Sequence, residues 1–123
     1  MAPASTLRVL VVDDAEDLRF LLRLRLQRTD HLEVVGEAED GVEAVEQARA
    51  LQPDLVILDV AMPRMDGLQA LPLIREAVPH VRVIMLSGFN EGTMAKSALA
   101  AGADHYLVKG GSLTELVALT EEL

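Results

Sequence analysis

The sequence predicts an α/β domain whose strands form one parallel sheet. Apolar segments of strand length alternate roughly five times with segments of helical periodicity, a pattern typical of βα units. The segment Leu55–Asp59 has four apolar residues in a row and no polar alternation, as expected of a strand buried on both faces. Four of the expected strands also end at polar or charged residues. We therefore expect the 123 residues to form a single domain with a five-stranded parallel sheet, right-handed crossovers and helices on both faces.

The five expected strands are recognised by their apolar composition and by the turn residues that bound them. The second is half polar, so we expect it at an edge of the sheet. The strands are Leu7–Val12, His31–Ala38, Leu55–Asp59, Val81–Leu86 and His105–Val108.

Five helices are expected between and after these strands. Asp14 or Asp17 could cap the first, and Ser112 could cap the last. Pro72 lies inside the third and should remove one backbone hydrogen bond and bend the helix. Gly92 makes the fourth intrinsically weak. The expected helices are Leu18–Arg28, Val42–Leu51, Gly67–Val78, Asn90–Ala101 and a last one from Ser112 to the end of the chain.

The first expected helix carries more apolar surface than one buried stripe needs. Leu18, Leu21, Leu22 and Leu26 fall on one side of it, and Phe20 and Leu24 fall together on an adjoining side. Either the sheet and the last helix cover both sides, or Phe20 and Leu24 form an exposed docking or dimer face flanked by arginines.

Composition and charge limit the kinds of partner. Hydrophobic residues make up 50% of the chain and aromatic residues only 2%, so the core must be aliphatic. The absence of cysteine rules out disulfides and thiolate metal sites and suits a reducing cytoplasm. No apolar run could span a bilayer, and the first residues lack a signal-peptide pattern. A net charge of −9 opposes binding to DNA or to anionic lipid, so we expect a cytoplasmic domain with no direct contact to nucleic acid or membrane.

Polar residues gather at the carboxyl ends of the expected strands. They are Asp13 and Asp14 after the first strand, Asp59 at the end of the third, Ser87 after the fourth and Lys109 after the fifth. A single aspartate in such a place is usually a helix cap or a turn residue. In a parallel sheet, however, all carboxyl ends meet at one edge, where open α/β sheets bind their ligands. Capping does not explain all of these positions together, and we expect a functional site there.

The residue types at this edge suit phosphoryl transfer. Three carboxylates repel one another unless a hard cation such as Mg²⁺ lies among them. A lysine supplies a point charge for a phosphoryl group, and a serine hydroxyl can donate a hydrogen bond to it. These groups favour phosphoryl transfer to Asp59 through positioning and charge neutralisation. His31, His80 and His105 are scattered and are expected to be surface or packing residues.

The combined motifs resemble the receiver domain of bacterial two-component response regulators, which is CheY-like in its fold. The resemblance covers essentially the whole chain. It rests on Val11–Asp14, Pro53–Asp59, Met62–Gly67, Ser87–Gly88 and Ala101–Lys109. It implies a doubly wound sheet of order 2-1-3-4-5, as in flavodoxin and the chemotaxis receiver.

The resemblance also implies the chemistry of the site. Asp59 would accept a phosphoryl group from a sensor histidine kinase. Asp14, Asp59 and the backbone carbonyl of Ala61 would hold Mg²⁺ directly, and Asp13 would act through water. The domain would then be a switch rather than an enzyme, catalysing only its own phosphorylation and dephosphorylation.

Three further positions match the family's signalling residues. Ser87 and Lys109 would contact the phosphoryl group, and Tyr106 would be the switch aromatic that turns inward when Ser87 moves. The resulting change would alter affinity for a partner or produce a homodimer on phosphorylation. Tyr106 could instead be an ordinary strand aromatic on the surface.

Some residues depart from the family pattern. Gly110 stands where the family usually has proline after the lysine, so the loop should be looser. Ala61 offers no side-chain function two residues after Asp59, and serine replaces the threonine that many members have at position 87. The segment Leu32–Ala38 and the pair Lys109–Gly110, which follows the fifth strand, are most similar to LuxR/NarL-type receivers. Receivers of that type are joined to a C-terminal helix-turn-helix. We therefore expect an effector domain beyond Leu123 that regulates transcription, and a stand-alone receiver acting through protein contacts is the alternative.

Two other functions fit parts of this pattern. An aspartyl-phosphate phosphatase of the haloacid-dehalogenase type also has an aspartate after a strand and Mg²⁺, but its second aspartate would fall at Ala61. A flavodoxin-like protein would need aromatic residues around its flavin, and this chain has no Trp, one Tyr and two Phe. The site chemistry favours the phosphorylation switch over both.

Overall fold

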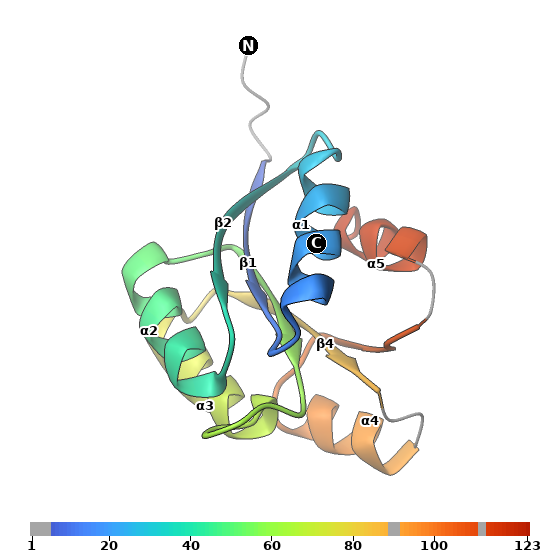
Figure 1. Cartoon of the computed structure of the whole chain (residues 1–123). Coiled ribbons are helices and arrows are strands. Elements are labelled where there is room, and N and C mark those ends of the chain that lie inside the picture. The colour runs from blue at the N-terminus through green and yellow to red at the C-terminus, as the bar shows by residue number, and fades with distance from the viewer. Residues whose placement is uncertain (1–5, 89–91, 111–112) are drawn as a thin grey trace.

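A computed structural model describes residues 6–88, 92–110 and 113–123. Five parallel strands form one sheet of order β2-β1-β3-β4-β5, which confirms the predicted fold (Figure 1). The strands are β1 (Leu7–Val12), β2 (Leu32–Ala38), β3 (Leu55–Asp59), β4 (Arg82–Ser87) and β5 (His105–Val108). The helices are α1 (Glu16–Gln27), α2 (Gly41–Leu51), α3 (Gly67–Ala77), α4 (Gly92–Ala100) and α5 (Leu113–Thr120).

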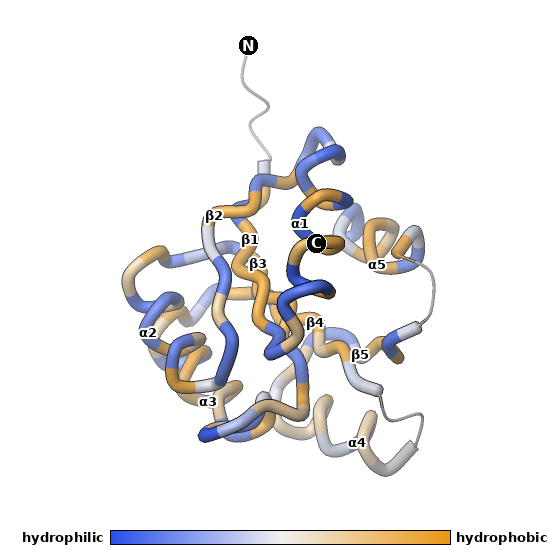
Figure 2. The backbone as a smooth tube through the Cα atoms, viewed as in Figure 1, coloured by the Kyte–Doolittle hydropathy of each residue, from blue (hydrophilic) through white to orange (hydrophobic). Residues whose placement is uncertain are grey.

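The helices cover both faces of the sheet. On one face, Leu22 and Leu26 of α1 pack with Leu116 and Val117 of α5 against β1, β3 and β4. On the other face, α2, α3 and α4 cover a second aliphatic cluster, to which α4 contributes Ala98. Figure 2 shows the apolar strands passing between these two helical layers. All five residues of β3 are buried, as its unbroken apolar run predicts.

The first turn of α1 differs from the prediction. The helix begins at Glu16, and its N-cap residue Ala15 makes no side-chain cap, so neither Asp14 nor Asp17 caps it. Instead Oδ1 of Asp13 accepts a hydrogen bond from the backbone nitrogen of Ala15 at 2.8 Å. The acidic loop is thereby joined to the start of the helix.

The side chains of α1 also differ in part from the helical-wheel prediction. Leu22 and Leu26 are buried, but Leu21 is 53% exposed, so its assignment to the buried stripe is wrong. Phe20 and Leu24 are exposed as well, at 49% and 43%. The sheet and α5 therefore cover only one side of α1.

Two aspartates cap the helices that flank the β3–α3 loop. The side chain of Asp40 accepts the backbone N–H of Glu43 at the start of α2. Asp66 forms a capping box with Gln69 at the start of α3. α3 continues through Pro72, which lies on its exposed side.

The last two helices end earlier than predicted. α4 ends at Ala100, and its expected start at Asn90 lies outside the described residues. α5 ends at Thr120 and is followed by a turn, and the expected cap Ser112 also lies outside the described residues. None of the described helices has the length and apolarity required to cross a bilayer.

Candidate functional site

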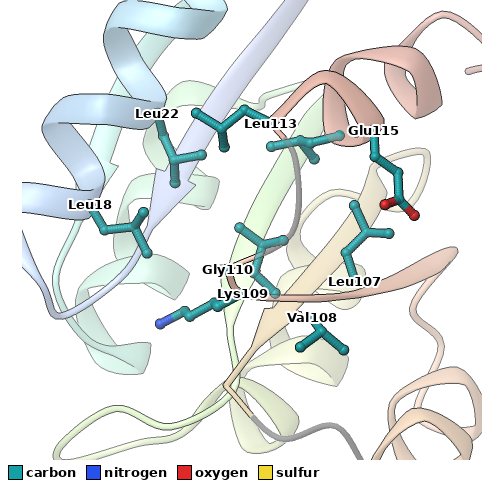
Figure 3. Close-up of a pocket in the computed structure, with 10 residues that line it drawn as sticks. Leu18, Leu22, Leu107, Val108, Lys109, Gly110, Leu113 and Glu115 are labelled. Carbon is teal, nitrogen blue, oxygen red and sulfur yellow. The ribbon is translucent and has the colours of Figure 1, made fainter.

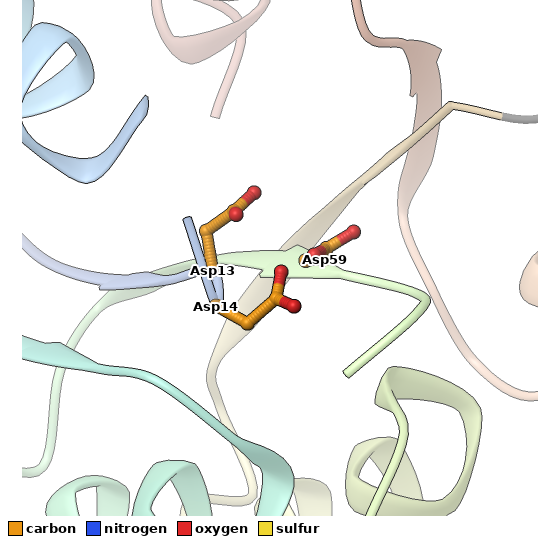
Figure 4. A group of neighbouring side chains, drawn as sticks. All are labelled: Asp13, Asp14 and Asp59. Atoms are coloured by element: carbon orange, nitrogen blue, oxygen red, sulfur yellow. The ribbon is translucent and has the colours of Figure 1, made fainter. Parts of the chain in front are cut away.

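The strand register brings the predicted carboxylates together. Val12 of β1 pairs with Leu58 of β3, so Asp13 and Asp59 follow side by side on neighbouring strands. Carboxylate oxygens of Asp13, Asp14 and Asp59 all lie within 4.8 Å of one another, and Figure 4 shows the three side chains at the ends of their strands. Asp13 and Asp59 are each 1% exposed, whereas Asp14 faces solvent. The predicted acidic cluster is therefore formed by the fold.

Lys109, the residue after β5, reaches into this cluster. Its Nζ lies 2.8 Å from Oδ2 of Asp13 and 3.0 Å from Oδ1 of Asp59. The backbone nitrogen of Lys109 donates to the carbonyl of Ser87 at 2.6 Å, and Ser87 itself is buried at the end of β4. Lys109 and Ser87 are thus held beside each other at the edge where Asp59 ends its strand.

The cluster shifts the pKa values of its own members. Burial raises the pKa of Asp59 to about 6, helped by the nearby charge of Asp13 and opposed by the hydrogen bond from Lys109. Burial disfavours the charge of Lys109, but its hydrogen bonds to Asp13 and Asp59 outweigh this effect and raise its pKa. At neutral pH the site therefore holds an ionised Asp59 whose charge is incompletely compensated.

The donor set suits a hard divalent cation. Carboxylate oxygens are the ligands that Mg²⁺ prefers in proteins. Oδ2 of Asp59 is buried and has no hydrogen-bond partner in the part of the chain described. Oδ2 of Asp13 is also buried, and the contact it makes among the described residues is the ion pair with Lys109. Asp13, Asp14 and Asp59 therefore form a cluster that could hold such an ion.

Ala61 lies in the loop that joins β3 to α3. This loop is closed at its base, because the backbone nitrogen of Gly67 donates to the carbonyl of Val60 at 2.8 Å. A Cβ atom at position 67 would lie 2.1 Å from the carbonyl oxygen of Asp59, so only glycine fits this close approach. Ala61 itself is exposed beside Asp59.

The remaining predicted residues lie around this edge. Tyr106 is half buried on β5 and packs against the cluster covered by α2, α3 and α4. Gly110 has a φ of 90°, which proline, with φ fixed near −65°, could not adopt. His31 is a packing residue whose Nε2 lies 2.8 Å from Oγ1 of Thr120, and no histidine belongs to the acidic group found in the described ranges.

A separate apolar cavity lies behind Lys109. Leucines of α1, β4, β5 and α5 line most of it, together with the stem of Lys109 and Gly110 (Figure 3). None of the three clustered aspartates lines it. This cavity is therefore distinct from the acidic site, although Lys109 borders both.

Sequence reasoning missed one ion pair near the site. Arg64, in the β3–α3 loop, pairs with Oδ2 of Asp40, the capping residue of α2. The hydrogen bond from Arg64, together with that from the backbone of Glu43, holds the pKa of Asp40 below its usual range. Asp40 followed by Gly41 is a recognisable helix start, but its pairing with a residue 24 positions away depends on the fold.

The profile of the response regulator receiver domain matches residues 9–121. The chain belongs to this family. VraR, a response regulator protein of Staphylococcus aureus, is 39% identical over 111 residues, which cover 90% of this receiver domain and 53% of VraR. The receiver domain thus spans about half the length of the curated relatives it matches.

Two solved structures extend the comparison to the fold. The signal receiver domain of NarL from Mycobacterium tuberculosis has a TM-score of 0.89 and 35% identity, covering 96% of this chain and 95% of that one. A DNA-binding response regulator of the LuxR family from Staphylococcus aureus has a TM-score of 0.87 and 26% identity, covering 94% and 97%. These similarities assign the chain to the CheY-like receivers of the LuxR/NarL type, which are signalling domains of two-component systems.

Proposed function

We propose that this receiver domain is a phosphorylation switch that accepts a phosphoryl group on Asp59 from a sensor histidine kinase. The observation that carries the proposal is the contact between Lys109 and Asp59 within a cluster of three carboxylates. A carboxylate that could act as nucleophile, an ammonium that could approach the transferred group and a carboxylate cluster that could hold a divalent cation thus lie at one sheet edge.

The reaction needs only the ionised carboxylate of Asp59 as nucleophile. One of its oxygens attacks phosphorus and forms a P–O bond, while the P–N bond of the phosphohistidine donor breaks. The electron pair of the P–N bond stays on the departing imidazole, which leaves as the neutral base because its other ring nitrogen carries a proton. Lys109, Ser87 and bound Mg²⁺ would neutralise charge on the transferred phosphoryl oxygens rather than form covalent bonds.

The metal ligands follow the family's pattern. Asp14, Asp59 and the carbonyl of Ala61 would hold Mg²⁺ directly, and Asp13 would bind through water. The exposure of Asp14 and the burial of Asp13 agree with this division, because an exposed carboxylate can turn toward an entering ion. When bound, Mg²⁺ would supply positive charge that offsets both the carboxylates and the transferred group.

Signal transmission would begin at Ser87 and Lys109. A phosphoryl group on Asp59 adds negative charge that the Lys109 ammonium and the Ser87 hydroxyl can approach. Ser87 ends β4, the last strand before α4 in the chain, and Tyr106 packs on the same face as Ala98 of α4. A shift of Ser87 could therefore be transmitted to both α4 and Tyr106.

The output that we propose is transcription regulation through a C-terminal DNA-binding domain. The chain spans about half the length of its curated relative VraR, and one solved relative is named as a DNA-binding regulator. The net charge of −9 argues against DNA binding by the receiver domain itself. Phosphorylation would then act through homodimer formation or through contacts with another protein.

The exposed side of α1 is our candidate for kinase docking. Phe20, Leu21 and Leu24 are exposed there, and the Arg23 guanidinium lies 5.4 Å from the centroid of the Phe20 ring. Arg23 is held there by its ion pair with Glu37, and exposed apolar side chains beside a held arginine suit an amphipathic helical partner.

The first test is Mg²⁺-dependent phosphorylation by acetyl phosphate, followed by intact-mass spectrometry. We expect the wild-type protein to gain one phosphoryl group in Mg²⁺ and none in EDTA. The Asp59→Asn variant should gain none in either buffer. Equal labelling of wild type and Asp59→Asn would refute the proposed acceptor.

A further inference from the structure

The β3–α3 loop is fastened to the start of α2 by two contacts outside the acidic site. The guanidinium of Arg64 pairs with the carboxylate of Asp40, and the backbone nitrogen of Gly41 donates to the carbonyl of Met65 at 2.9 Å. A Cβ atom at position 41 would lie 2.4 Å from that carbonyl oxygen, so the two segments approach more closely than a side chain would allow. We call this pair of contacts the loop clamp.

The partners in the clamp differ greatly in exposure. Asp40 is 1% exposed, and its other oxygen already accepts the Glu43 N–H that caps α2. Arg64 is 66% exposed and adopts a φ of 65°, a conformation that costs a non-glycine residue free energy. An exposed arginine gains little from an ordinary surface ion pair, so here the rigid, buried partner is what fixes its loop.

The clamp acts on the same short loop that carries Ala61. The base of the loop is closed by the Gly67 to Val60 hydrogen bond, and its far side is held at Arg64 and Met65. Ala61 lies between these two anchors. The side chains of Arg64 and Asp40 also line one groove with Asp14, so the clamp borders the acidic site.

We propose that Arg64 is a positioning residue that, through Asp40, holds the Ala61 carbonyl where the metal site requires it. This inference rests on the proposed Mg²⁺ site. Arg64 pairs with Asp40, which is not one of the three clustered carboxylates, so it would act on the ion only through the loop. Its effect is to limit the loop to the conformation that presents a backbone ligand to an ion bound by Asp14 and Asp59.

A purely electrostatic effect and a positioning role predict opposite changes in Mg²⁺ affinity when Arg64 is replaced. Replacing Arg64 by glutamine removes a positive charge near three carboxylates, and this should strengthen cation binding. Replacing Asp40 by asparagine removes a negative charge and should weaken it. A positioning role predicts that both changes weaken Mg²⁺ binding, so the sign for Arg64→Gln separates the two explanations.

The test is calorimetric titration of the full chain with MgCl₂. We expect Arg64→Gln and Asp40→Asn each to raise the Mg²⁺ dissociation constant about threefold to tenfold, with the double variant no worse than the weaker-binding single one. Arg64→Lys keeps the charge and should recover part of the affinity. Asparagine remains a good helix cap, so Asp40→Asn should fold normally.

Arg82→Gln is the matched control for charge and exposure. Arg82 is 56% exposed, pairs with Asp104 at 3.8 Å and lies at the amino end of β4, away from the carboxylates. Its replacement should leave the dissociation constant within about twofold of wild type. Hydrogen exchange in EDTA provides a second readout, in which Arg64→Gln should speed exchange across residues 60–66 more than Arg82→Gln does.

Unchanged or tighter Mg²⁺ binding by Arg64→Gln would overturn the inference. An effect no larger than that of Arg82→Gln would do the same. If Asp14→Asn bound Mg²⁺ as well as the wild-type chain does, the proposed metal site itself would be wrong, and the positioning role would be lost with it.

Discussion

Lys109 Nζ lies 3.0 Å from Oδ1 of Asp59, so the proposed phosphoryl acceptor is paired with a cation before any donor binds. The same ammonium contacts Asp13 at 2.8 Å. One lysine therefore partly compensates two buried carboxylates. Because the compensation is incomplete, the metal-free site should cost stability, and this cost can be measured.

Asp59→Asn should stabilise the metal-free protein at alkaline pH. Folded Asp59 retains its proton up to about pH 6, whereas the unfolded chain releases it near the ordinary value of 3.8. The native state therefore binds more protons between these values, and stability falls as pH rises through this window. At about pH 8 the variant should gain about 1–3 kcal/mol of unfolding free energy in EDTA.

Urea denaturation followed by circular dichroism measures this gain. The difference between variant and wild type should shrink as pH falls below the unfolded value of 3.8, toward about pH 3, where Asp59 is protonated in both states. Asp54→Asn, at an exposed position before β3, serves as a control for the loss of one negative charge. A difference that does not change with pH would contradict the assignment of the penalty to Asp59.

Lys109→Met should have the opposite effect on stability. It leaves Asp13 and Asp59 buried without their cation, so we expect a loss of about 1–3 kcal/mol at about pH 8 in EDTA. The double variant Lys109→Met/Asp59→Asn should recover most of this loss, because one buried charge is then absent. Additive effects of the two substitutions would mean that the pair does not interact.

The same Lys109 variant tests signal transmission. It should still accept some phosphoryl group from acetyl phosphate, since Asp59 and the carboxylate cluster remain. Phosphorylation should no longer change self-association, measured by analytical ultracentrifugation with and without acetyl phosphate. A normal response in this variant would remove Lys109 from the transmission step.

Phe20→Ser should separate kinase recognition from phosphoryl chemistry. Phe20 is 49% exposed on α1, so its loss should leave the melting temperature and acetyl phosphate labelling nearly unchanged. Phosphotransfer from a sensor kinase that uses the wild-type chain should slow about tenfold or more. Leu99→Ser, at an equally exposed position on α4, is the matched control and should transfer normally. Parallel loss of both labelling reactions would show that Phe20 supports the fold instead.

The rate of hydrogen exchange in α4 should change when a phosphoryl analogue and Mg²⁺ occupy the acidic site. Gly92 lowers the helix propensity by roughly 1 kcal/mol relative to alanine, and Ala98 is the buried side chain of α4 among its described residues. We expect hydrogen exchange across Gly92–Ala100 to slow when fluoroberyllate and Mg²⁺ are added. Exchange that is identical in both states would place the moving element elsewhere.

The sequence predicted the fold and the acidic site well, because both depend on local signals. Buried strands such as Leu55–Asp59 have an unambiguous composition, and the geometry of a parallel sheet then brings their carboxyl ends together. Asp13, Asp59 and Lys109 could therefore be predicted as neighbours without coordinates.

Features that depend on packing between elements could not be predicted in the same way. Leu21 and Leu22 are both leucines on the predicted apolar side of α1, but the rotation of α1 on the sheet leaves Leu21 exposed. The Asp13 side chain accepts a hydrogen bond from the backbone nitrogen of Ala15, and α1 begins at Glu16, earlier than predicted. The Arg64–Asp40 pair joins two loops whose proximity follows from the crossover geometry and not from any sequence pattern.

The most direct test of the account is to locate the phosphoryl group itself. After reaction with acetyl phosphate and Mg²⁺, borohydride reduction converts an acyl-phosphorylated aspartate to homoserine, which peptide mass spectrometry can locate. We predict homoserine at position 59 and unmodified aspartate at positions 13 and 14. Modification at either of those positions with Asp59 intact would contradict the central claim.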